Sequence, residues 1–164
     1  GQDGVLVPGP EQDTSLWDPM LIDRSAHLLT LAKTKAQSGR FQLEAAIQAV
    51  HAARAVTGRT DWRALSKLYA GLMQIYPTIG AAVSRAAVVA EDAGHSEGLA
   101  LLEKIQADLS RYQPAYAVRA SCYAALGQIA EADQAYEKAI SLATDAPSRR
   151  WLEKKRTELR KKMS

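Results

Sequence analysis

The spacing of apolar residues predicts a chain built of helices. From Thr14 onward alanine and leucine dominate, and apolar residues recur at i, i+3 and i+4, which is the period of an amphipathic helix. No segment alternates apolar and polar residues with the β-branched and aromatic enrichment that is typical of a strand. We therefore expect an all-α fold.

Glycine and proline divide this pattern into eight expected helices, because glycine suits the residue after a last turn and proline suits a first turn. The short turns between them indicate antiparallel neighbours, as in helical hairpins. Before them, residues 1–13 are rich in glycine, proline and acids, and we interpret them as an extended linker to a helical domain at 14–164. The expected helices cover residues 16–38, 41–56, 61–76, 79–93, 97–109, 114–126, 130–142 and 147–162.

An internal repeat of 34 residues organises the helices. A shift of this length places Arg85-Ala86 over Arg119-Ala120 and Glu97-Gly98 over Glu131-Ala132. The same step backwards places Ala52 over Ala86. Three copies result, at about residues 45–78, 79–112 and 113–146.

This period resembles the tetratricopeptide repeat (TPR), a helical hairpin in which small residues stand where the two helices cross and a large residue fills the gap beside them. End helices would cap the stack, since each repeat leaves one face unburied. We expect an all-α right-handed superhelix of about three TPR-like hairpins, with cap helices at 16–38 and 147–162. The third copy fits best, through Ala120, Tyr123, Gly127, Ala132, Tyr136 and Ala139.

Composition and charge narrow the class of protein further. With 164 residues, of which 47% are hydrophobic and 24% charged, the chain can bury a core of its own. The formal charge of +3 lacks the basic excess of an obligate nucleic-acid binder. The single cysteine, Cys122, argues against disulfides and suits a reducing compartment, so we expect a cytoplasmic location. No apolar run approaches the roughly 20 residues of a membrane span, and we expect no membrane partner.

The sequence contains no motif that is typical of a catalytic site. His27, His51 and His95 fall on separate elements without metal-ligand spacing, and there is no glycine-rich phosphate loop or nucleophile motif. Cys122, beside Tyr123, is expected to be a buried and inert thiol. We expect no enzyme, no catalytic residue, no metal and no cofactor.

The first candidate binding site is the trio His51, Arg85 and Arg119, which share one position in the three copies where TPRs normally have an apolar residue. First helices of successive repeats stack about 10 Å apart, so the trio could form a ladder that holds an acidic segment. The alternative is that each residue pairs with a nearby Glu or helix-end carbonyl and only ties the repeats together.

The second candidate is the concave face of the stack. Small side chains there would leave a shallow apolar groove for a helix or an extended peptide. Equally, the apolar cluster Val5-Leu6-Val7 of the linker could fill this groove. The expected lining is Ala49, Ala53, Val83, Ala87, Ala117, Ser121 and Ala124.

The third candidate is the basic last helix, because residues 149–162 sum to +6 while the rest of the chain sums to −3. These residues could touch DNA or an acidic protein surface. The sequence favours the alternative of a solvated cap that complements the helix dipole, since no aromatic residue interleaves with the charges after Trp151. The cations are Arg149, Arg150, Lys154, Lys155, Arg156, Arg160, Lys161 and Lys162.

Several short segments, found in order over roughly residues 3–159, resemble a more specific class of domain than the TPR. They are residues 11–13 and 15–18, residues 41–52 (FQLEAAIQAVHA), residues 60–62 (TDW) with 64–65 and 68–69, residues 85–86 with 89–91, and residues 98–102 (GLALL). With these phrases the chain resembles the C-terminal domain of those extracytoplasmic-function (ECF) bacterial RNA polymerase sigma factors that carry repeat-like helices after their DNA-binding regions. Thr14 and Ser84 depart from the usual Arg and Asn, and Pro19 enters the first helix, which puts polar contacts at positions 14 and 84 in doubt.

The resemblance implies a regulatory domain that acts in transcription initiation through protein contacts. The partners would be regions two and four of the same sigma factor, core RNA polymerase or a separate signal protein. DNA would be bound only by regions two and four, which this sequence lacks, and the start at Gly1 fits a longer natural protein. The competing class is a stand-alone TPR adaptor or scaffold that binds a peptide or helix and has no role in transcription.

Overall fold

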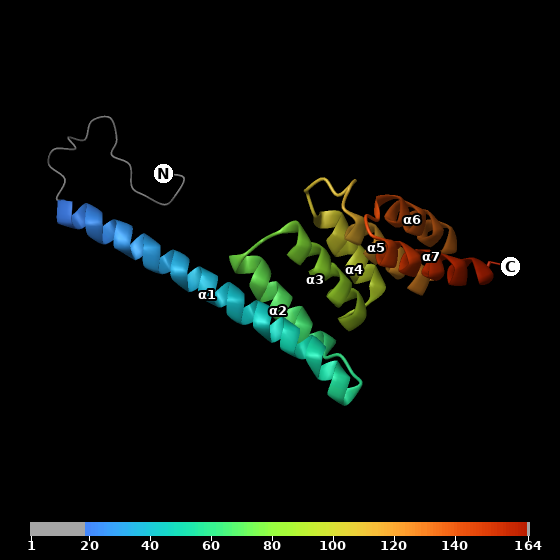
Figure 1. Cartoon of the computed structure of the whole chain (residues 1–164), viewed down its shortest axis with the longest axis horizontal. Helices are drawn as coiled ribbons and strands as arrows, with labels where there is room; N and C mark the ends of the chain where they lie inside the picture. Colours follow the sequence, from blue (N-terminus) through green and yellow to red (C-terminus); the bar gives the residue numbers. More distant parts are fainter. Residues whose placement is uncertain (1–18, 164) are drawn as a thin grey trace.

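The computed structural model describes residues 19–163, and within that range it contains helices and turns but no strand. The all-α prediction is confirmed. Each helix packs against the next one in the chain, and α3 also packs against α5, so the helices form a row of hairpins (Figure 1). The helices are α1 (Pro19–Thr57), α2 (Trp62–Ile75), α3 (Ile79–Asp92), α4 (His95–Lys104), α5 (Gln113–Ala125), α6 (Ile129–Leu142) and α7 (Ala146–Lys161).

The first helix corrects the sequence prediction, because α1 runs unbroken through Gly39, where two helices were expected. Gly39 keeps a negative φ, and a Cβ built on it would lie 3.3 Å from the Ile75 side chain of α2. The glycine therefore permits a close approach of two helices instead of ending one. The next residue, Arg40, links α1 to the end of α2. Its Nε lies 3.1 Å from a Glu44 oxygen on α1, and its guanidinium carbon lies 3.8 Å from the centre of the Tyr76 ring.

As a consequence, residues 19–38 of the expected cap helix at 16–38 form part of α1 and not a helix of their own. The first hairpin consists of the C-terminal half of α1 and α2, while the N-terminal half of α1 extends beyond α2 (Figure 1). The predicted linker at residues 1–13 lies outside the described residues. At the other end, α7 occupies the position expected for the C-terminal cap helix.

Two other helix ends follow the glycine signals. Gly58 and Gly127 have φ values of +73° and +78°, as expected for the residue that stops a helix. At the end of α5, the Gly127 N–H donates to the Ala124 carbonyl at 3.1 Å, and the Gln128 N–H donates to the Tyr123 carbonyl at 2.9 Å. This pair of bonds is a Schellman motif, and it turns the chain into α6.

The fourth helix is shorter than the pattern predicts, because α4 ends at Lys104. The Asp108 carboxylate accepts a hydrogen bond from the Ser110 backbone N–H at 2.9 Å, a local turn that competes with the helix, and the same bond lowers the pKa of Asp108. Leu109 and Tyr112 still pack against the core between α3, α4 and α5. The apolar spacing that suggested a longer helix thus belongs to an irregular segment that covers the core.

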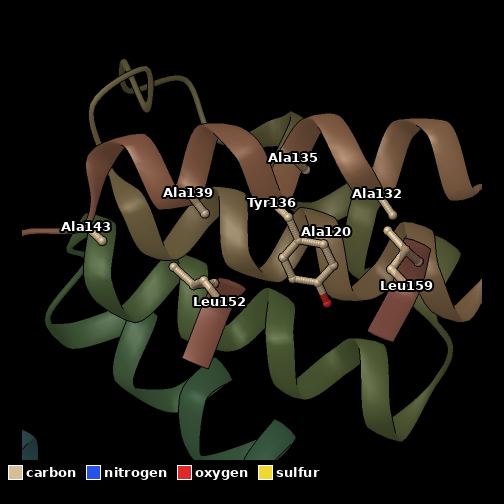
Figure 2. Packing of buried hydrophobic residues seen from close by; sticks show 8 residues of the cluster. All are labelled: Ala120, Ala132, Ala135, Tyr136, Ala139, Ala143, Leu152 and Leu159. Atoms are coloured by element: carbon tan, nitrogen blue, oxygen red, sulfur yellow. The ribbon is translucent and has the colours of Figure 1, made fainter. Parts of the chain in front are cut away.

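The core at the C-terminal end joins α5, α6 and α7 (Figure 2). Alanines without exposed surface allow α5 and α6 to pack closely, and the Tyr136 ring extends from α6 between Leu152 and Leu159 of α7. Small residues at the crossing and one large residue beside them are the arrangement that the third copy predicted. The buried members are Ala120, Ala132, Ala135, Tyr136, Ala139, Ala143, Leu152 and Leu159.

The preceding hairpin has a tighter crossing. Gly98 of α4 stands where the third copy has Ala132, and a Cβ built on Gly98 would lie 2.6 Å from the Ala90 Cβ and 2.9 Å from the Ala86 carbonyl oxygen. Both neighbours belong to α3, and neither is the end of a flexible side chain. The glycine is therefore required by the distance between α3 and α4, although it lowers the helix propensity of α4.

We predict that Gly98→Ala lowers the free energy of unfolding by about 1–3 kcal/mol, the usual cost of overpacking. Urea denaturation followed by circular dichroism measures this loss. The matched control is Gly71→Ala in α2, where the nearest atoms to a Cβ are Leu43 methyl carbons at 3.7 Å. This control is expected to gain up to about 1 kcal/mol from helix propensity, and equal losses in both variants would contradict the close crossing of α3 and α4.

Candidate functional site

The structure separates the predicted ladder into two parts. Arg85 on α3 and Arg119 on α5 are half-buried, and these two helices pack against each other. His51 is exposed on α1, which packs chiefly against α2. The shared position in the repeat thus places both arginines on neighbouring helices and leaves the histidine on a different surface.

Arg85 has an unusual environment for a cation. Its Nε is buried and has no hydrogen-bond partner among residues 19–163. A buried polar N–H without an acceptor destabilises the fold, and a charged group does so more strongly. The alternative in which Arg85 pairs with a nearby Glu or a helix-end carbonyl does not hold for this atom.

Arg119 lies beside an aromatic ring with a second cation. Its guanidinium carbon is 5.3 Å from the centre of the Tyr116 ring, and the Lys138 Nζ is 5.9 Å from the same centre, both within the range of cation–π attraction. The three side chains border an open pocket of about 230 Å³ between α5 and α6. Two cations and one acid on its wall favour an anionic group. The lining is Tyr116, Arg119, Tyr123, Glu131, Gln134, Ala135 and Lys138.

One residue of the predicted concave groove lies in the core. Val83 is only 2% exposed and packs with Leu102 and Ala115 in the core of α3, α4 and α5, so its assignment as a groove residue was wrong. The physical reason is that α4 and α5 cover this face of α3. The remaining six residues divide into half-buried positions, Ala87, Ala117 and Ala124, and exposed ones, Ala49, Ala53 and Ser121.

Ala49 and Ala53 line a second open pocket of about 570 Å³ at the end of α1. Residues of the turn into α2 complete this pocket, and the sequence pattern had not indicated them as lining residues. Gly58 is the signal that could have found the pocket, because a helix that stops there sends the chain back across the last turns of α1. The lining is Ala49, Val50, Ala53, Thr57, Arg59, Thr60 and Asp61.

The basic last helix uses part of its charge inside the fold. The Nε atoms of Arg156 and Arg160 lie 2.9 Å and 3.0 Å from the same Asp133 oxygen, and Arg156 Nη2 lies 3.0 Å from a Glu137 oxygen. The Arg156 and Arg160 hydrogen bonds hold the pKa of Asp133 at about 2, below its ordinary 3.8. These residues attach α7 to α6.

The remaining cations of α7 face solvent. Arg150, Lys154, Lys161 and Lys162 are exposed, whereas Arg149 donates a hydrogen bond to the Ala143 carbonyl at 3.1 Å. Lys155 is half-buried, with Nζ 5.6 Å from the centre of the Trp151 ring. Part of the predicted basic tail therefore binds groups of the fold itself, and the other part lies exposed on its surface.

Cys122 is buried, as the sequence suggested. Burial, with a smaller contribution from the charge of Glu91, raises the pKa of its thiol to about 11. The thiol is therefore protonated at neutral pH and poorly nucleophilic. Over residues 19–163, no group of three or more His, Cys, Asp or Glu side chains is arranged to hold a metal ion. In that same part of the chain, no helix combines the length and apolarity needed to cross a membrane.

Comparison with known proteins gives one informative similarity. An uncharacterized protein of Rhizobium meliloti (strain 1021) is 32% identical over 143 residues, which are 87% of this chain and 34% of that protein. This chain therefore spans about a third of the length of the relative. No model of a protein family matches the sequence, and no solved structure matches it.

We predict that Asp133→Asn lowers the free energy of unfolding by about 2.5 kcal/mol at pH 7, from a pKa difference of nearly two units at about 1.4 kcal/mol each. Because the folded-state pKa is depressed, the wild type holds this stability above pH 4 and loses it as the pH falls toward 2. Urea denaturation at pH 7 and at steps from pH 4 to 2.5 should show the two proteins converging.

The control for this prediction is Glu137→Gln, because the Glu137 side chain is 68% exposed and its ion pair is screened by water. It should change stability by less than about 0.5 kcal/mol. A gap between wild type and Asp133→Asn that stays constant down to pH 2.5 would contradict the role of the ionised carboxylate.

Proposed function

We propose that this chain is an accessory domain that regulates a bacterial sigma factor through protein contacts during transcription initiation. The resemblance to the C-terminal domain of ECF sigma factors over roughly residues 3–159 supports the assignment. The similarity to about a third of a longer Rhizobium protein is in keeping with a domain of a larger chain. A row of helical hairpins, with long exposed helix faces, is an architecture that binds other proteins.

The observation that carries a docking role is Arg85, a half-buried cation whose Nε lacks an acceptor in the described part of the chain. Arg85 lies on α3, and Arg119 on α5 lies beside Lys138 and Tyr116. A carboxylate of the partner would accept hydrogen bonds from these guanidinium groups, which bind carboxylates in a forked geometry. The partner surface that we infer is an acidic helix or loop.

Within this proposal the docking is intramolecular or within the polymerase. A domain joined to its partner by a linker experiences an effective concentration in the millimolar range, so a weak contact is enough to shift a sigma factor between competent and silent arrangements. The partners are regions two and four of the same sigma factor, core RNA polymerase or a signal protein, all in the bacterial cytoplasm. The role is binding, not catalysis, in keeping with the protonated and buried Cys122.

The proposal predicts that the double variant Arg85→Ala, Arg119→Ala binds its partner at least tenfold more weakly, since hydrogen bonds to charged groups contribute about 1.5–3 kcal/mol each. Isothermal titration calorimetry of the 164-residue chain against separately expressed sigma regions two and four, and against core RNA polymerase, measures this loss. Circular dichroism reports whether the variant keeps its helices.

The matched control is Lys67→Ala, Lys104→Ala, which removes two exposed cations from α2 and α4 and should leave binding unchanged. Binding that the arginine variant keeps would contradict the docking site. Absence of binding to both the sigma regions and core polymerase would contradict the sigma-factor role. Capture of an acidic peptide by the wild type in that case would point to the TPR adaptor instead.

A further inference from the structure

We propose that the part of α1 that extends beyond α2 binds one amphipathic helix of a partner protein, with acidic residues along the edges of that helix. This surface goes beyond the arginine site proposed above, involves different residues and does not depend on it. The observation that carries the proposal is that the apolar pattern by which α1 packs on α2 continues where α2 no longer covers it (Figure 1).

The covered half of α1 packs through residues that repeat every seven positions. Leu43 and Val50 form one line and pack in the core shared with α2 and α3. Gly39 and Ala46 form the other line, where Gly39 lets the Ile75 side chain approach and Ala46 is half-buried. Two lines with a period of seven lie on one side of a helix and form the seam of a coiled coil.

Both lines continue into the uncovered half of α1. The helix that packs against α1 is α2, which ends at Ile75 beside Gly39. Before that point, every position from 23 to 38 is exposed except Leu29, which is half-buried. At 1.5 Å per residue the continued seam is about 17 Å long. We call it the open stripe of α1, and its residues are Ser25, Leu29, Ala32 and Ala36.

Continuity with the α1–α2 interface favours a helix as the occupant. The open stripe offers the same seam to a second helix, which would lie against α1 in line with α2, beyond the α2 C-terminus. Small residues in one line of the seam let a helix approach closely, and Leu29 in the other line supplies apolar surface. An extended peptide is a poorer match, because a helix uses its backbone groups internally and offers none to an added strand.

Charge complementarity selects a partner with acidic edges. Lys33 and Lys35 are exposed and lie on opposite edges of the open stripe, at the two positions whose charges choose the partner in a coiled coil. Asp23 is the acid of residues 19–38, and at 100° per residue it falls on the opposite side of α1. A second copy of this chain would therefore place lysine against lysine, whereas a helix edged with Glu or Asp would pair with both.

The test is fluorescence anisotropy of the 164-residue chain with a fluorescein-labelled, side-chain-stapled helical peptide of 14 residues, the length of α2. The peptide carries Leu and Ala on one face and Glu along both edges of that face. We expect a dissociation constant below about 100 µM, and at least tenfold weaker binding of the same peptide with Lys in place of Glu.

Variants of the chain locate the surface. Leu29→Gln, Ala36→Gln changes the open stripe and should lower the affinity for the Glu peptide at least tenfold, with helical circular dichroism unchanged. The matched control is His27→Gln, Thr34→Gln, which places the same side chains at exposed positions on the opposite side of α1 and should lower the affinity less than threefold.

Absence of peptide binding, equal affinity for the Glu and Lys peptides, or equal losses in the two variants would overturn the proposal. Three further outcomes would overturn it by assigning the open stripe to another occupant. A dimer in analytical ultracentrifugation that Leu29→Gln, Ala36→Gln abolishes would indicate a second copy. Tighter peptide binding by Val5→Asp, Leu6→Asp, Val7→Asp would indicate the chain's own residues 5–7. Displacement of the peptide by phosphatidylserine vesicles that bind the same stripe would indicate a membrane surface.

Discussion

Close contact between paired helices is the constraint on which the rest of this structure depends. At the α3–α4 crossing the space beside Gly98 is too small for a methyl group, and at the α5–α6 crossing Ala120, Ala132 and Ala139 have no exposed surface. Because α5 and α6 cross at small residues, little space remains between them, and the large Tyr136 side chain fills the gap beside the crossing. Positions further along the same helices can then carry polar groups at half-buried sites.

The two arginine arrangements show what this packing allows. Arg156 crosses from α7 to Asp133 of α6 and satisfies its hydrogen bonds within the fold, so that ion pairs complete the end of the stack where no further hairpin follows. Arg85 stands inside the stack, and its buried Nε has no acceptor among the described residues. The first arrangement stabilises the fold, whereas the second lowers its stability, because a buried donor without an acceptor keeps its desolvation cost.

The sequence predicted those features of the fold that depend on one residue and its immediate neighbours. The left-handed stops at Gly58 and Gly127 and the small residues at the α5–α6 crossing each follow from conformational freedom or volume at a single position. Gly39 misled the prediction because a glycine needed for the approach of Ile75 looks the same in sequence as one that ends a helix. Val83 misled it because burial by α4 and α5 is a property of the assembled stack.

Contacts of charged side chains between helices were also not predictable from the sequence. Repeat register placed Arg85 and Arg119 on equivalent turns, but it could not find Lys138, which reaches the Tyr116 ring from the other helix of the hairpin. The charge of +6 over residues 149–162 likewise says nothing about which cations the fold itself uses. Only the path of α7 over Asp133 distinguishes the arginines that fix the helix from the other basic residues near it in sequence. For a helix that caps a stack, the sequence sets the total charge, and packing against the last hairpin decides how much of it the fold itself uses.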